Sequence, residues 1–192
     1  MSLEPPSGVM QDPGLNQNTK RWISELYKVV SEQRQWQHLE TLDTTSGASV
    51  TTTEIFPSNC TAIRLVFDGI STSGTNNIII QLGTSGGLVT SGYTGAANRM
   101  NNTSPDHSNR TDGFDIRRTA SGDDYIGIAD IQKTTPTSTE WVYSYVAGDT
   151  ASSVTSIGGS RVDAAGTVTQ LKILLSGADS FDAGAVDIWY YG

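Results

Sequence analysis

The sequence predicts an all-β protein, an antiparallel β-sandwich or jelly roll, preceded by an extended N-terminal arm and one short helix. Composition is the first observation: among 192 residues, 36% are hydrophobic, 17% are charged and 20 are glycine. Such a mixture is typical of turn-rich β proteins. The second observation is a series of alternating apolar segments separated by glycine-containing turns. Because no helical pattern lies between these segments, a parallel α/β sheet is excluded.

The first 18 residues predict an extended arm, because Pro5, Pro6 and Pro13 interrupt regular structure and few neighbours are apolar. Two interpretations remain open, a disordered leader and a peptide that becomes ordered on a partner. The arm lacks the basic start and apolar stretch of a secretory signal. We therefore expect the protein to be made in a cytosol and to leave it only as part of a larger particle.

Residues 19–38 predict one amphipathic helix, with Thr19 as its N-cap. Four apolar residues follow the spacing of a coiled-coil seam. They are Trp22, Leu26, Val29 and Trp36. Since so short a helix is marginally stable in isolation, this surface must pack on its own domain, on copies of itself or on a different protein. These residues are therefore the candidates for anchoring and oligomerisation.

The segment 39–47 resembles a join, so we expect an N-terminal domain of residues 1–46 and a β domain of residues 47–192. Apolar residues alternate along the expected strands, as at Ile63, Leu65 and Phe67. The expected strands lie near 48–56, 61–68, 77–82, 124–131, 140–147, 152–158, 167–175 and 185–191. Their short spacing favours a sandwich or jelly roll.

A long polar stretch at 83–118 departs from this pattern. Long loops in compact β domains usually carry function or contain edge strands that a pattern search misses. We therefore expect this stretch to be the exposed contact surface. The candidate contact residues are Arg99, Asn101, His107 and Arg110.

The sequence contains few of the residue patterns that catalysis requires. The two histidines, His38 and His107, and the single Cys60 are too few and too widely spaced for a zinc site. A Gly-x-Ser-x-Gly motif is absent, and only Glu140 beside Trp141 suggests a glycosidase acid. We expect no enzyme activity, no cofactor and no metal, and we expect Cys60 to be a small buried residue.

Two alternatives are left open by short clusters of side chains. Aspartates in the loops, such as Asp112 and Asp115, could bind calcium or simply stabilise turns. Trp141, Tyr143 and Tyr145 share one strand face and could stack on a sugar or build a core or subunit interface.

Charge and hydropathy narrow the range of partners. The net charge of −8 and pI of about 4.6 disfavour binding to nucleic acid or to an anionic membrane, because phosphate contacts need clustered Lys and Arg. The sequence has no run of 18 apolar residues, so we expect no membrane insertion.

The C-terminal segment resembles the closing strands of virion-associated β-sandwich proteins of tailed bacteriophages. The motifs are Leu-Lys-Ile-Leu-Leu-Ser-Gly at 171–177, Phe-Asp-Ala-Gly at 181–184 and Val-Asp-Ile-Trp-Tyr-Tyr-Gly at 186–192. The segment 62–67, Ala-Ile-Arg-Leu-Val-Phe, is also similar to a strand of such domains.

This resemblance implies a structural component of the virion, of the tail fibre, head fibre or capsid decoration type. It implies a homotrimer that contacts other virion proteins through its N-terminal segment. The projecting sandwich would either stabilise the particle or serve host attachment through a surface glycan. An alternative is a carbohydrate-binding module without catalysis, which would be monomeric and would need no particle.

Overall fold

The computed structural model describes residues 11–31, 35–100, 106–117, 121–122, 124–149 and 154–192. The chain divides into two compact units, Met1–Gln35 and Trp36–Gly192. The second unit is an antiparallel β-sandwich, which confirms the predicted all-β fold.

The first unit contains the helix α2, Gln17–Ser31. Its N-cap is Asn16, whose side-chain oxygen accepts hydrogen bonds from the Thr19 backbone N–H at 2.9 Å and from the Thr19 hydroxyl at 3.1 Å. The predicted Thr19 cap is therefore wrong, because Thr19 already lies in the first turn. Within this unit, Trp22 and Leu26 are exposed on the helix surface. Val29 lies on the same helix, but its side chain is outside the described part.

The predicted helix ends too late, because β1 occupies Trp36–Asp43. This strand pairs antiparallel with β13, Phe181–Tyr191, from Trp36 opposite Tyr191 to Asp43 opposite Ala185. Backbone hydrogen bonds to a neighbouring strand outweigh the helical spacing that placed Trp36 and His38 on a helix. The boundary between the units thus falls after residue 35 rather than after residue 46.

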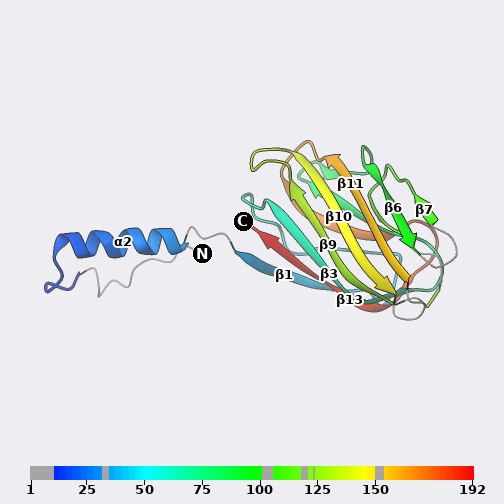
Figure 1. Ribbon diagram of the computed structural model, residues 1–192, viewed down its shortest axis with the longest axis horizontal. Helices are drawn as coiled ribbons and strands as arrows, with labels where there is room; N and C mark the ends of the chain where they lie inside the picture. The colour runs from blue at the N-terminus through cyan, green and yellow to red at the C-terminus, as the bar shows by residue number, and fades with distance from the viewer. Residues whose placement is uncertain (1–10, 32–34, 101–105, 118–120, 123, 150–153) are drawn as a thin grey trace. The chain divides into compact units, whose positions relative to one another are not determined.

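The larger sheet has eight strands, which lie across the β unit in Figure 1 from β1 at one edge to β7 at the other. Their order is β1, β13, β3 (Ala62–Thr72), β9 (Tyr125–Lys133), β10 (Glu140–Asp149), β11 (Val154–Asp163), β6 (Thr94–Met100) and β7 (Asp106–Ser108). The second sheet is β2 (Ser49–Thr51), β12 (Val168–Leu175), β4 (Ile78–Thr84) and β5 (Gly87–Leu88), with β8 (Phe114–Ile116) paired to β4.

The core lies between the two sheets and is built by alternating side chains. Ile63, Leu65 and Phe67 of β3 are buried, as their spacing predicts. Trp141 and Tyr143 of β10 are also buried, so this strand face belongs to the core and is not available to stack on a sugar. Each such large side chain contributes about 1.5–3 kcal/mol when it is fully buried. Cys60 is buried as expected, and desolvation raises the pKa of its thiol to about 11.

The C-terminal motif carries the chain from one sheet to the other, since β12 and β13 belong to different sheets. Phe181 anchors the start of β13 in the core. Gly184 has a φ of 88°, and a Cβ at this position would lie 2.3 Å from the Gly69 carbonyl oxygen. Glycine is therefore required where the bulged β13 passes β3.

Candidate functional site

The 83–118 stretch contributes to the core, contrary to the prediction that it is an exposed loop. It contains the strands β5, β6, β7 and β8, which are too short or too polar for the apolar pattern to reveal. Tyr93 and Phe114 are fully buried, with their rings in an edge-to-face contact at 4.9 Å. The Tyr93 hydroxyl accepts the Leu82 backbone N–H at 3.0 Å, and burial raises the pKa of Tyr93 to about 12.

The four candidate contact residues do not form one surface. Arg99 is only 8% exposed, so its prediction as a surface contact is wrong. Arg110 is partly buried and donates two hydrogen bonds to Asp112, at 2.8 and 2.7 Å. His107 is exposed on β7, and Asn101 lies outside the described residues. Of the three candidates that the structure describes, only His107 therefore keeps the exposure that the prediction required.

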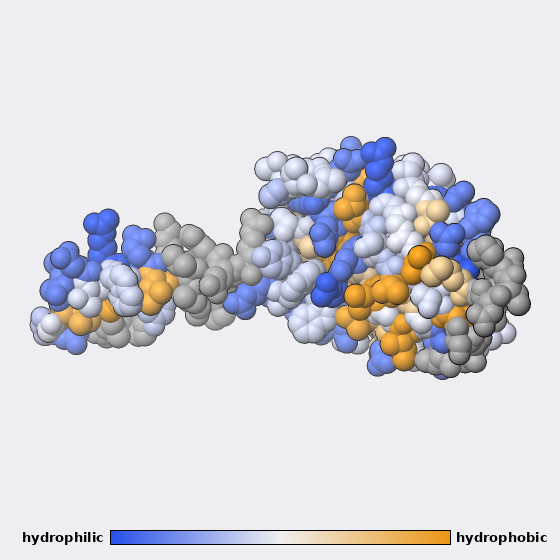
Figure 2. Space-filling model, viewed as in Figure 1, coloured by the Kyte–Doolittle hydropathy of each residue, from blue (hydrophilic) through white to orange (hydrophobic). Residues whose placement is uncertain are grey.

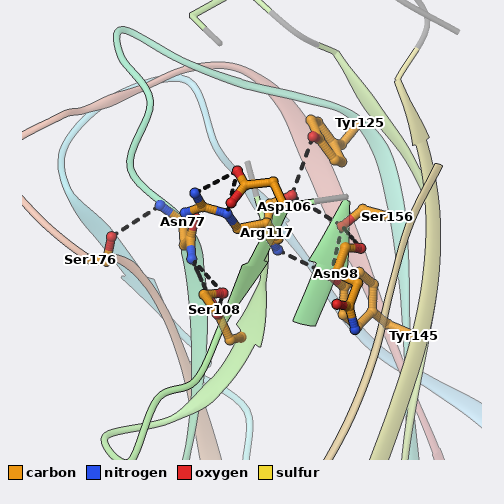
Figure 3. Close-up of polar contacts among 10 residues, drawn as sticks. Asn77, Asn98, Asp106, Ser108, Arg117, Tyr125, Tyr145, Ser156 and Ser176 are labelled. Carbon is orange, nitrogen blue, oxygen red and sulfur yellow. Dashed lines mark hydrogen bonds and ion pairs between the residues drawn. The ribbon is translucent and has the colours of Figure 1, made fainter. Parts of the chain in front are cut away.

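A buried polar network joins the two sheets at one end of the sandwich (Figure 3). Asn77 donates from its amide to the Asp115 carboxylate at 2.9 and 3.1 Å and to Ser108 at 3.2 Å. Ser108 also donates to Asp115. The Asn77 backbone N–H donates to Ser176 at 3.0 Å. These bonds tie β7 of the larger sheet to β8 of the second sheet and to Asn77, directly before β4.

Arg117 continues this network from β8 towards the larger sheet. Its guanidinium donates to Asp106 at 2.7 Å and to the Asn77 amide oxygen at 3.1 Å, as Figure 3 shows. Its backbone carbonyl accepts from Ser156 at 3.1 Å, and its N–H donates to the Tyr145 hydroxyl at 3.1 Å. Arg117, directly after β8, is thus held by side chains of the larger sheet and by Asn77.

Asp115 is the buried carboxyl group of this network, and its pKa is shifted towards the neutral form. Desolvation by burial raises its pKa, and hydrogen bonds from Ser108 and Asn77 oppose that change. The hollow that Asp115 shares with Arg110 and Tyr143 is too narrow to admit a water molecule. A substrate therefore has no access to the carboxylate here, and the network fits a structural role better than a catalytic one.

The aspartates considered for calcium have protein partners instead. Asp112 pairs with Arg110, whose hydrogen bonds lower the pKa of Asp112, and Asp115 accepts hydrogen bonds from Asn77 and Ser108. Within the described part of the chain, no three His, Cys, Asp or Glu side chains are grouped to hold a metal ion. Over those same residues, no helix is long and apolar enough to span a membrane.

The outer face of the larger sheet carries a row of apolar side chains. Ile128 lies opposite Val66 on one side and Val146 on the other, and Val146 lies opposite Ile157. Ile128, Val146 and Ile157 are all exposed. Apolar residues over β9, β10 and β11 gather in the orange region of Figure 2. A contiguous exposed apolar patch commonly marks a contact with another protein.

At the β1 edge, this row meets a shallow hollow of about 400 Å³ on the same face. The hollow is lined by Trp36, Arg64, Val66, Asp187 and Trp189. The sequence pattern missed this site because Trp36 was assigned to the helix. Trp189 alternates with the buried Ile188 and the half-buried Tyr190, and this alternation was the one sign in the sequence that Trp189 faces outward.

Comparison of the sequence with models of known protein families and with curated proteins gave no match.

Proposed function

We propose that the chain is a structural component of a bacteriophage virion, without enzyme activity. Its N-terminal unit anchors the protein and assembles it into a homotrimer. Its β-sandwich projects from the particle, where it stabilises the shell or tail or contacts the host. Tail fibre, head fibre and capsid decoration remain equal alternatives within this proposal.

The division of the chain into two units is the observation that carries the proposal. The helix of the first unit exposes Trp22 at 65% and Leu26 at 44%. An amphipathic helix of 15 residues needs a partner for such a surface. The sandwich, by contrast, has its own continuous core. One unit is thus suited to attachment and the other to presentation.

Two further observations support an assembled rather than a solitary protein. The motifs that resemble phage virion proteins coincide with β12 and β13, including Gly184, whose conformation the bulged crossing requires. The apolar row of Val66, Ile128, Val146 and Ile157 offers a second surface for a neighbouring virion protein.

The protein composition of purified phage particles tests the proposal. Mass spectrometry of gradient-purified virions, from a phage that encodes this chain, is expected to find it in multiple copies. A phage encoding the protein without residues 1–35 should yield particles that lack it, while the truncated protein stays folded in the lysate. Absence of the full-length protein from the virions would contradict the proposal. Incorporation of the truncated protein would contradict the role of its N-terminal unit.

A further inference from the structure

We propose that the hollow between β1, β13 and β3 is a binding site for a neutral saccharide. These three strands lie side by side, with β13 in the middle (Figure 1). The site belongs entirely to the sandwich unit, so the inference does not depend on the role proposed for the helix or on virion assembly.

Two indole rings provide the apolar part of the site. Trp36 on β1 is 37% exposed, and Trp189 on β13 is half-buried. Both line the same hollow, whose volume of about 400 Å³ lies within the range of small-ligand sites. The C–H face of a pyranose ring is apolar and flat, and it can cover an indole ring as other flat groups do.

Neighbouring side chains hold both rings in place. The Tyr191 ring lies 5.7 Å from the Trp36 ring, and the Arg64 guanidinium carbon lies 4.8 Å from the Trp36 ring centre. The His38 ring contacts Trp189 edge-on at 5.0 Å. Because these contacts restrict the indoles before a ligand arrives, little side-chain entropy is lost on binding.

Arg64 and Asp187 line the hollow together with the two indole rings and supply its hydrogen-bonding groups. Asp130 accepts from Arg64 Nε at 2.7 Å and from Nη2 at 2.9 Å, which occupies two of the five guanidinium N–H groups. Asp187 accepts from the Thr41 hydroxyl through Oδ1 at 2.5 Å and has a second oxygen. The Asp187 and Arg64 side chains are 42% and 38% exposed. Acceptors and donors beside an aromatic surface match the hydroxyls around a sugar ring.

Charge balance selects a neutral saccharide over an acidic one. The Arg64 cation is already paired with Asp130, and Asp187 adds a negative charge to the hollow. The whole chain carries a net charge of −8. A ligand that bears phosphate, sulfate or carboxylate groups would therefore be repelled rather than attracted.

The test uses the full chain on a glycan array that presents both neutral hexose or N-acetylhexosamine oligosaccharides and acidic oligosaccharides. We expect binding to neutral glycans, weakened about tenfold or more by Trp189→Ala and by Arg64→Ala. Arg161→Ala is the matched control, because Arg161 lies on the same sheet and is also ion-paired, with Glu140 at 2.9 Å, but does not line the hollow. This control should bind as the unmodified chain does.

Three outcomes would overturn the inference: no binding to any neutral glycan, binding only to acidic glycans, or equal binding by the Trp189→Ala variant. Thermal melts of each variant establish that it is folded before the array is read. If Trp189→Ala does not fold, Asp187→Asn takes its place, because this change keeps the side-chain shape while it replaces a charged acceptor by a neutral amide. If Asp187→Asn and Arg64→Ala then both bind neutral glycans as tightly as the unmodified chain does, the proposed site is overturned. Native mass, which reports on assembly, should be the same for all variants.

Discussion

The Trp36 ring lies 5.7 Å from the Tyr191 ring, so two residues separated by most of the chain meet on neighbouring strands. This contact places Trp36 in the sandwich, where β1 covers one side of β13. It changes the point at which the N-terminal unit can be removed without damage. The contact also holds Trp36 at the proposed saccharide site, which Trp36 lines.

A truncation that respects this boundary should leave the sandwich intact. We expect the chain without residues 1–35 to melt cooperatively, close to the temperature of the full chain, because all strands of the second unit remain. Removal of residues 1–44 also deletes β1 and uncovers β13, so its melting temperature should be several degrees lower. Differential scanning calorimetry of both proteins provides the comparison. Equal melting temperatures would mean that β1 contributes nothing to the sandwich.

The final strand should be essential to folding. β13 lies between β1 and β3, and Ile188 is fully buried. Ile188→Ala should lower the free energy of unfolding by roughly 2–5 kcal/mol. Deletion of residues 186–192 should prevent folding altogether. Tyr191→Ala, at a half-buried position, should have a smaller effect than Ile188→Ala. Urea denaturation measures all three, and a truncated protein that unfolds like the full chain would exclude this account of β13.

The two arginines of the 83–118 stretch should differ sharply in their effect on stability. Arg99→Ala removes a buried side chain and should cost roughly 1–3 kcal/mol in the free energy of unfolding. Arg110→Ala removes a partly exposed ion pair with Asp112 and should cost only about 0.5 kcal/mol. Chemical denaturation of the two variants tests this order. Equal and small effects would restore the view that both residues belong to an exposed surface.

Burial of Asp115 should give stability a specific dependence on pH. Its pKa is raised in the folded protein, so the folded state retains the proton more strongly than the unfolded state. This contribution is fully present below the unfolded pKa of about 3.9 and is lost as pH rises through the folded pKa. The stability of the native chain relative to Asp115→Asn should therefore fall as pH increases from 4 through that range.

Urea unfolding of both proteins at a series of pH values measures that difference. The Asp115→Asn side chain keeps the size of the original, so it serves as its own control for packing. A relative stability that instead increases with pH would show that Arg110 and Arg117 favour the ionised carboxylate more than burial disfavours it.

Strands with a clear apolar alternation could be predicted from the sequence. Strands whose place depends on pairing with a distant part of the chain could not. Ile63, Leu65 and Phe67 show the period of two and are buried as expected. β1 has few apolar residues, and its place is set by pairing with β13, which lies far away in the sequence. Local spacing therefore favoured a helix through Trp36, although long-range pairing decides the structure.

The candidate site was harder to predict than the fold. Arg99 is buried because β6 pairs with β11, a relationship that no local pattern around Arg99 reveals. The hollow at Trp36 and Trp189 likewise depends on three strands that are distant in the sequence. The sequence alone left open whether Trp141 and Tyr143 stack on a sugar or build a core, and their burial assigns them to the core.

The native mass of the full chain in solution tests the central claim most directly, namely that the N-terminal helix assembles a protein whose sandwich folds independently. Light scattering should give a mass of about three chains of 20.5 kDa each. The double variant Trp22→Ser and Leu26→Ser should give the mass of a single chain with an unchanged melting temperature. A monomeric full chain, or a variant that remains trimeric, would contradict the account.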